Sequence, residues 1–440
     1  MSIILTPGHI EVAESEFIGR HPDTLSTCLV ADLVDSIAAA THTKNSGFML
    51  NFKSGEVPQL TDSQLGEYVM AAGLPYGLEK LRVDLSAQVS ALNAINIPPV
   101  PVRVNVAGQV TAPDLKAGEL EEIIFEDVTN VFRDAGYFLH GDFNPDFIVV
   151  DTKGIKSQSP NLNGTTHQNK FADSCVVYGH YIREPFGIDG TFPSLAIAKS
   201  IDQTLKEIVL TNSIPSLRPD GKVHVSVVRK PDGFRVRDIY ISVAHASDVQ
   251  PDFRDVIEHR IYYAIKEFYK GEKIDISINH GGDFNHYFVN ADSGISGKKD
   301  SVIVTGGLHQ LGTDGIWGKC LYKASSVAIP YAFALSRAVC DAAGASFASV
   351  GVYARYGQER AELFLQEIYP KYENLRNKIN RALQTLPRDR DGIREVLGME
   401  VNFFTYRDFN NVGGFHHPDR PWKRNNPELV EALNKSLRRI

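Results

Sequence analysis

The sequence predicts an α+β protein built from repeated units, in which mostly antiparallel sheets are covered on one face by helices. Three observations lead to this prediction. The order strand, helix, strand, strand, helix occurs more than once along the 440 residues. Residues 216–245 form two runs of alternating apolar and polar side chains around a Lys-Pro-Asp-Gly turn, which is typical of a hairpin. Residues 193–210 repeat apolar side chains at helical spacing.

The elements of the first part of the chain follow from local periodicity. Apolar residues recur every four positions from Leu25 to Ile37, which predicts a helix that begins near Pro22. Further helices are expected at 65–74, 85–95 and 120–137, and strands at 101–112 and 146–151. The stretch near residues 44–98 shows no chemistry of its own.

The second part of the chain begins with a long polar connection, 153–174, of a length found in lids and linkers. After it we expect strands at 172–181, 273–279, 300–307 and 346–358, the hairpin at 216–245, and helices at 193–210, 253–269, 325–345 and from 361 to about 386. Together the elements suggest three α/β units with interleaved segments and approximate boundaries at 12–150, 151–290 and 291–440.

Composition narrows the class of protein. The net charge of −7 provides no basic excess, so we expect neither a nucleic acid nor a membrane surface as partner. The four cysteines are spread along the chain without a CxxC pair, which indicates neither a zinc site nor a disulfide framework. The start lacks a signal-peptide pattern, and eighteen apolar residues never occur in succession. A cytoplasmic location is therefore expected.

The stretch from Asn279 to Lys323 holds the densest chemistry. Four lysines lie in it, on two loops rich in glycine and acidic residues: Lys298, Lys299, Lys319 and Lys323. Small residues let the backbone approach a ligand, and clustered ammonium groups supply charge for a polyanion. The predicted strand 300–307 separates the loops and lets them face a common ligand. The stretch therefore indicates phosphate binding, with a solvated hairpin and surface lysines as the alternative.

A second candidate lies at the start of the first long helix, in His21-Pro22-Asp23. Pro22 suits a first helical turn, and a carboxylate beside the free N–H groups is stabilised by the helix dipole. Asp23 therefore serves either as a cap, the commoner role, or as a ligand of a divalent metal.

Eight short motifs occur in an order and at spacings that resemble the S-adenosylmethionine synthetases, or methionine adenosyltransferases, of the bacterial and eukaryotic type. They are HPD, QSPNLN, ADS, SLRPDGK, INHGGDF, DSGISGKK, WGKCLYK and FHHPDRPWKR. The resemblance implies three similar α/β subdomains in a pseudo-threefold arrangement, and a homodimer or homotetramer with a shared active site. It also implies transfer of the adenosyl group of ATP to L-methionine, followed by hydrolysis of tripolyphosphate to phosphate and diphosphate.

The same resemblance implies roles for individual residues. His21 would lie beside the ribose oxygen that leaves with the triphosphate, and Asp23 would bind Mg²⁺. The expected phosphate ligands are Lys222, Lys298, Lys299 and Lys319. The expected adenosine contacts are Asp173, Asp220 and Phe284. The expected methionine contacts are Gln109, Gln158, Asp292 and Lys323, and the segment from Gln158 to Asp173 would be a gating lid.

Several positions depart from the family pattern. Thr24 stands where the family has a lysine, Lys298 replaces an arginine, and Ser325 replaces an aspartate that binds magnesium. Gln109 replaces a glutamate, and Asn96 is a neutral stand-in for the acidic ligand of K⁺. These changes leave open an enzyme that uses a related thioether or releases tripolyphosphate unhydrolysed. They also leave open a non-catalytic nucleotide-binding regulatory subunit.

Overall fold

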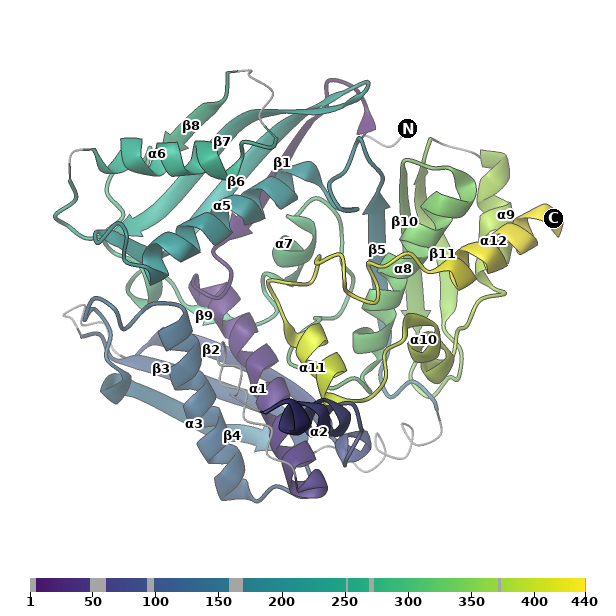
Figure 1. Cartoon of the computed structure of the whole chain (residues 1–440), viewed down its shortest axis with the longest axis horizontal. Helices are drawn as coiled ribbons and strands as arrows, with labels where there is room; N and C mark the ends of the chain where they lie inside the picture. Colours follow the sequence, from purple (N-terminus) through teal and green to yellow (C-terminus); the bar gives the residue numbers. More distant parts are fainter. Residues whose placement is uncertain are drawn as a thin grey trace.

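The computed structural model describes residues 5–47, 61–92, 99–157, 169–250, 252–268, 273–370 and 373–439. Within these ranges the chain forms three sheets, each packed against helices, so the predicted α+β class is confirmed (Figure 1). The pseudo-threefold arrangement and the boundaries of the three units stay predictions.

Two sheets of four strands share one order along the chain. A helix is followed by two antiparallel strands, a second helix, and a strand that pairs in parallel with the second of the two. The first has the order β4-β3-β2-β9 and packs against α1 and α3, and the second has the order β1-β6-β7-β8 and packs against α5 and α6. The first is built from α1 Pro22–Ser46, β2 Arg82–Ala91, β3 Val102–Thr111, α3 Ala117–Asp134, β4 Ile148–Lys156 and β9 Gly294–Ile295. The second is built from β1 Ile10–Glu16, α5 Pro193–Leu210, β6 Leu217–Lys230, β7 Gly233–His245, α6 Phe253–Ala264 and β8 Asp275–Ile278.

The third sheet has the order β11-β10-β5 and is fully antiparallel. Helix α8 packs across β5 and β10, and α9 packs against β11. Its elements are β5 Cys175–Ile182, α8 Ala324–Ala343, β10 Phe347–Ala354, β11 Glu362–Tyr369 and α9 Glu373–Leu383. The remaining helices are α2 Asp62–Ala72, α7 Asp300–Thr305, α10 Arg390–Leu397, α11 Phe403–Asn410 and α12 Pro427–Arg439.

Helix α1 is a core helix, although it is long and apolar enough to cross a membrane by length and composition. Of its most apolar window, 67% is buried inside the molecule. It packs against β2, α3 and α11, and its four-residue apolar repeat from Leu25 to Ile37 is fully buried. The helix predicted from that repeat is therefore confirmed.

Three predicted elements are wrong in type. Residues 300–305 form α7 rather than a strand, because Ile303 and Val304 are buried on one side and Gly306 ends the helix in a left-handed conformation. Residues 85–91 belong to β2 rather than a helix, since the strand is hydrogen-bonded between β3 and β9. The single helix predicted from 361 is instead β11, paired with β10, followed by α9.

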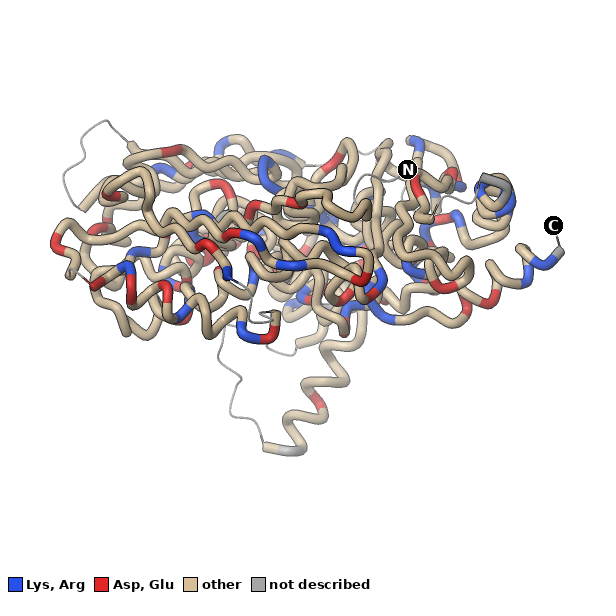
Figure 2. The backbone as a smooth tube through the Cα atoms, turned by 90° about the horizontal axis from the view of Figure 1, so that it is seen from above, with Lys and Arg blue, Asp and Glu red and all other residues tan. Residues whose placement is uncertain are grey.

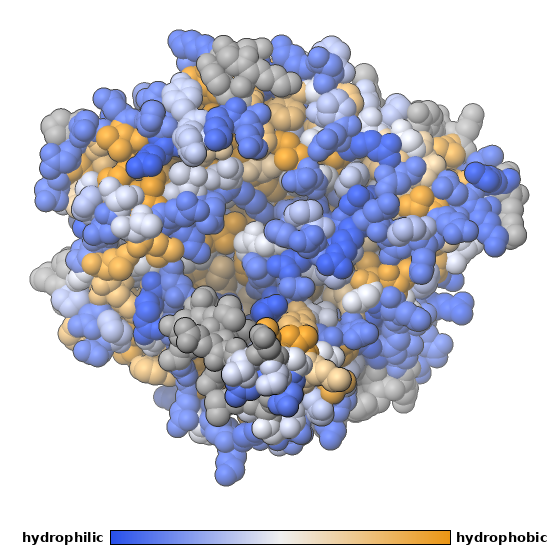
Figure 3. All heavy atoms as spheres, in the orientation of Figure 1, coloured by the Kyte–Doolittle hydropathy of each residue, from blue (hydrophilic) through white to orange (hydrophobic). Residues whose placement is uncertain are grey.

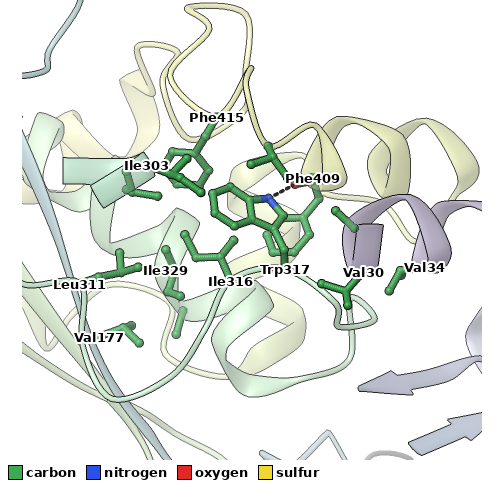
Figure 4. Packing of buried hydrophobic residues seen from close by; sticks show 14 of the residues in the cluster. Val30, Val34, Val177, Ile303, Leu311, Ile316, Trp317, Ile329, Phe409 and Phe415 are labelled. Carbon is green, nitrogen blue, oxygen red and sulfur yellow. Dashed lines mark hydrogen bonds between the residues drawn. The ribbon is translucent and has the colours of Figure 1, made fainter. Parts of the chain in front are cut away.

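The largest core joins the first and third sheets and anchors the loop that carries Lys319. Ile316 and Trp317 from this loop are buried among residues of α1, α7, α8 and α11, as Figure 4 shows. The Trp317 indole N–H donates to the carbonyl of Phe409 at 3.2 Å. Rigid packing on either side of Lys319 therefore fixes where its side chain starts.

One face of the molecule shows how polar and apolar side chains are distributed. Figure 3 shows hydrophobic side chains in scattered patches between hydrophilic ones on this face. Helix α2 projects from the slab formed by the other elements (Figure 2), and it exposes Val69 and Met70 by 50% and 73%.

Candidate active site

The start of α1 is held by side-chain contacts that fix His21 and Asp23. The His21 imidazole caps the helix and accepts from the backbone N–H of Asp23 at 3.4 Å. Thr24 is fully buried, and its hydroxyl donates to the carbonyls of Phe17 and His21 at 2.6 and 3.1 Å. The residue that replaces the family's lysine is thus a fully buried structural hydroxyl.

Asp23 does not cap its own helix but joins α1 to the first lysine loop. Its buried carboxylate accepts from the N–H of Ile295 at 3.0 Å and lies 2.9 Å from the Lys298 ammonium. The hydrogen bond with Asp23 raises the pKa of Lys298 above its usual value. Gly294 permits the close approach, because a Cβ there would meet the carbonyl oxygen of Pro22 at 2.0 Å. The N-cap itself is His21, and Asp23 lies in the first turn, where the helix dipole stabilises its charge; its role as a metal ligand stays a prediction.

The second sheet contributes three charged side chains next to this turn. Lys299 reaches Glu14 of β1 at 3.4 Å, and Glu14 lies 4.0 Å from the His224 imidazole on β6. Asp220 is buried on β6 and accepts from the N–H of Phe288 at 2.8 Å. Burial raises the pKa of Asp220, while the nearby charges of His21 and Lys222 oppose that rise. Asp220 thus lies within electrostatic reach of His21 and Lys222.

The second lysine loop runs along the edge of β2. The Leu85 N–H donates to Gly318 at 2.7 Å and the Cys320 N–H donates to Val83 at 2.9 Å, so Lys319 sits opposite Asp84. The Lys319 ammonium is paired with Asp314 and lies 3.5 Å from the Ser325 hydroxyl.

Lys323 is nearly buried and pairs with Asp84 at 2.7 Å. Burial lowers the pKa of Lys323, but the Asp84 carboxylate raises it by more, so the net pKa lies above the usual value. Gln109 of β3 stands directly across from Asp84, and the charge of Asp173 also acts on Lys323. Lys323 and Gln109, both predicted from the sequence, therefore lie next to one carboxylate, and Asp173 lies within electrostatic reach of Lys323.

Asp300 connects the two lysine loops. It follows Lys299 in the chain, and its carboxylate accepts from the N–H of Ile316 at 2.9 Å, in the loop that carries Lys319. Burial raises the pKa of Asp300 to about 6, and the Lys319 charge opposes that rise. One buried carboxylate thus sets the position of one phosphate-site loop relative to the other.

The other predicted residues are less closely tied to this arrangement. Phe284 packs at the edge of the large core, and its backbone exchanges two hydrogen bonds of 3.0 Å with His245. Asp292 is exposed, and its charge acts on Lys298. Gln158 and Asn96 lie outside the described residues.

Sequence reasoning missed four carboxylates that pair with or position the lysines: Glu14, Asp84, Asp300 and Asp314. Asp84 and Glu14 lie on strands whose alternating pattern was available in the sequence, at 83–89 and 10–16. Their lysine partners lie more than 200 residues away, so no local pattern connects the two sides.

The donor set fits magnesium at Asp23 better than at Ser325. Mg²⁺ in phosphate-transfer sites is commonly bound through one or two carboxylates together with substrate phosphates. Asp23 offers such a carboxylate, from which a metal ion would have to displace the Lys298 ammonium at 2.9 Å, whereas Ser325 offers only a hydroxyl, a weaker ligand, 3.5 Å from the Lys319 ammonium. No group of three His, Cys, Asp or Glu side chains among the described residues is arranged to hold a metal ion.

Comparisons with known proteins agree with the motifs. No protein-family model matches the chain. It is 28% identical over 250 residues to an S-adenosylmethionine synthase of Thermus thermophilus, a match that covers 55% of this chain and 61% of the relative. It is 31% identical over 219 residues to an S-adenosylmethionine synthase of Wolinella succinogenes, which covers 46% of this chain and 55% of that relative. The matched segments thus span less than two thirds of these curated relatives.

A solved structure extends the likeness in fold to nearly the whole chain. An unusual S-adenosylmethionine synthetase from Campylobacter jejuni superposes with a TM-score of 0.71 at 17% identity, over 97% of this chain and 99% of that chain. At that identity the superposition establishes the fold, and the sequence matches establish the relationship. The protein is a distant homologue of the S-adenosylmethionine synthases.

Proposed function

We propose that this protein transfers the adenosyl group of ATP to the sulfur of L-methionine and hydrolyses the released tripolyphosphate to phosphate and diphosphate. The observation that carries the proposal is that the two lysine loops are joined to each other through Asp300 and to α1 through Asp23. Lysines predicted to hold phosphate and lysines predicted to hold an amino acid thereby share one region of the fold. The distant homology supports the same activity.

The chemistry asks for positioning and charge rather than a base. A thioether sulfur is a neutral nucleophile, so the rate depends on aligning it with the sugar carbon and on stabilising the leaving triphosphate. His21 is proposed to lie beside the ribose oxygen that leaves. Lys222, Lys298, Lys299 and Lys319 are proposed to bind the phosphates.

Three of these phosphate ligands face carboxylates in the structure: Lys298 faces Asp23, Lys299 faces Glu14 and Lys319 faces Asp314. A triphosphate carries more charge than the carboxylates, so it would draw the ammonium groups away from them. The lysines are therefore neutralised by carboxylates in the structure, and the site becomes positively charged only when these ion pairs open.

The adenosine and methionine ends are assigned by the resemblance. Asp173, Asp220 and Phe284 are proposed to contact adenosine. Gln109, Gln158, Asp292 and Lys323 are proposed to contact methionine. Of the proposed methionine contacts, Gln109 and Lys323 both lie next to Asp84, which supports a common methionine end.

Asp23 is proposed to hold Mg²⁺ together with the phosphates. When bound, the ion would neutralise charge that develops on the triphosphate oxygens. Potassium is a further expected cofactor, and Asn96 is the residue that stands at the position of its usual ligand.

A cytoplasmic homodimer or homotetramer with a shared active site is proposed as the working form. Ile10 and Val12 support this part of the proposal, because they are 44% and 49% exposed on β1, the strand that carries Glu14. A second copy packed on this face would cover both side chains next to the candidate site.

The decisive experiment incubates the purified full chain with ATP, Mg²⁺, K⁺ and L-methionine and follows S-adenosylmethionine and phosphate separately. Both products are expected. Sulfonium without phosphate would show that tripolyphosphate is released, the variant that Ser325 favours. Bound ATP without turnover on methionine or on a panel of related thioethers would show a non-catalytic nucleotide-binding subunit and refute the proposal.

A further inference from the structure

We infer that Asp84 binds the α-ammonium group of the substrate and, with Lys323, selects a zwitterionic amino acid as the adenosyl acceptor. This inference rests on the proposed function, because it assigns the acceptor end of that site. It goes beyond it by naming a residue that no motif indicated and by assigning to that residue the recognition of the acceptor's ammonium group.

The position of Asp84 is set by strands on both sides. On one side it pairs in register with Gln109 of β3, and on the other it forms an antiparallel bridge with Lys319. Residues directly opposite in antiparallel pairs point to the same face of a sheet. The side chains of Gln109, Asp84 and Lys319 therefore leave one face in a row.

Two glycines allow this close three-way approach. A Cβ at Gly108 would lie 2.1 Å from the Asp84 carbonyl oxygen, and one at Gly318 would lie 2.4 Å from the Leu85 carbonyl oxygen. Both glycines also have positive φ, at 136° and 81°, which other residues adopt only with strain. The backbone thus tolerates no larger residue beside Asp84 on either neighbouring segment.

The Asp84–Lys323 pair presents two opposite charges that are complementary to the two charges of a zwitterion. Its charges lie 2.7 Å apart, with the lysine side chain 6% exposed and the aspartate side chain 33% exposed. An amino acid can place its carboxylate on Lys323 and its ammonium on the open side of Asp84. Four alternating charges then meet without any net charge being buried.

Gln109 explains why a carboxylate is needed at Asp84. An amide at this position offers a dipole but no negative charge for an ammonium group. Asp84 stands directly opposite, so it can supply that charge from the adjacent strand. The negative charge that the family has at position 109 of β3 is thus supplied here from Asp84, on the neighbouring strand β2.

The test measures ligand binding to the full chain by calorimetry, in the presence of Mg²⁺ and a non-hydrolysable ATP analogue. The probes are L-methionine and 4-(methylthio)butanoic acid, which lacks the α-amino group. Asp84→Asn is expected to weaken methionine binding about 10- to 100-fold, the range for a hydrogen bond to a charged group, and to leave the acid unchanged or better bound. Asp84→Asn combined with Gln109→Glu is expected to regain most of the methionine affinity, because it returns a carboxylate to the opposite strand.

Asp151→Ala is the matched control, since Asp151 lies on β4 of the same sheet outside the proposed site. Thermal unfolding of every variant checks that the protein still folds when Lys323 lacks its partner. Equal affinity of wild type and Asp84→Asn for methionine, or equal loss of both probes, would overturn the inference. Absence of methionine binding by the wild type would overturn it too.

Turnover by the wild type is measured separately. S-adenosylmethionine formation with a KM for methionine that Asp84→Asn leaves unchanged would keep the proposed function and reject the role of Asp84. Selective methionine binding without turnover would keep the role of Asp84 and reject the proposed function.

Discussion

Lys319→Met and Lys298→Met together test whether the lysines act on the triphosphate. Both ammonium groups are assigned to phosphate, but the Lys319 side chain is 11% exposed and the Lys298 side chain is 48% exposed. Two unit charges about 4 Å apart interact by about 4 kcal/mol at an effective dielectric constant of about 20, and by about 1 kcal/mol in water. These limits correspond to roughly 1,000-fold and roughly 5-fold in rate.

The assay is steady-state formation of S-adenosylmethionine at saturating ATP and Mg²⁺. Lys319→Met is expected to lower kcat by roughly 100- to 1,000-fold, the range for removing one preorganised charge at a transition state, with little change in the KM for methionine. Lys298→Met is expected to lose far less, because water screens a half-exposed charge. Lys153→Met, an exposed lysine on β4, is the control. Equal losses in the first two variants, or a Lys319→Met defect confined to the KM for methionine, would refute the assignment.

Three further predictions concern the residues that frame the site. Burial raises the pKa of Asp300 from 3.8 to about 6, so its carboxylate opposes folding above pH 6 and this penalty is absent below its unfolded pKa. Asp300→Asn is therefore expected to add roughly 1–3 kcal/mol at pH 7.5 and nothing near pH 3.5 in urea unfolding; a gain that does not depend on pH would contradict this. Thr24→Lys, which restores the family's lysine, is expected to cost about 3 kcal/mol or more because the site is fully buried, and a folded, more active variant would count against that view. Asp23→Asn is expected to weaken Mn²⁺ binding by roughly 10- to 100-fold, measured by electron paramagnetic resonance, with unchanged binding as the opposing result.

The sequence pattern predicted an element correctly where the face that packs in the structure is the face on which its apolar residues recur. The helix at 193–210 and the hairpin at 216–245 were predicted correctly, because one face of each is apolar at the spacing its geometry requires. The errors fall on segments whose tertiary pairing or burial overrides the local pattern, including the long stretch from 361 that divides into β11 and α9. Residues 300–305 are β-branched and favour a strand, yet burial of Ile303 and Val304 and the glycine after them make a helix.

The candidate residues could be named from the sequence, but their partners could not. Motif order was enough to single out His21, Asp23 and the lysines of the two loops. For Lys299 and Lys323, the partner carboxylates Glu14 and Asp84 come from strands far away in the chain. Such pairs depend on sheet order, which no local pattern encodes.

The sequence by itself determined the α+β class, the positions of most long helices and strands, and the relationship to the S-adenosylmethionine synthases, because periodicity and short motifs are local properties of the chain. Only the tertiary structure decided that Asp23 joins α1 to the first lysine loop, that Thr24 is a buried structural residue, and that Asp84 stands between Gln109 and the second loop. The physical reason is that burial, ion pairs and cross-strand neighbours depend on how segments pack, and many of these segments lie far apart in the chain.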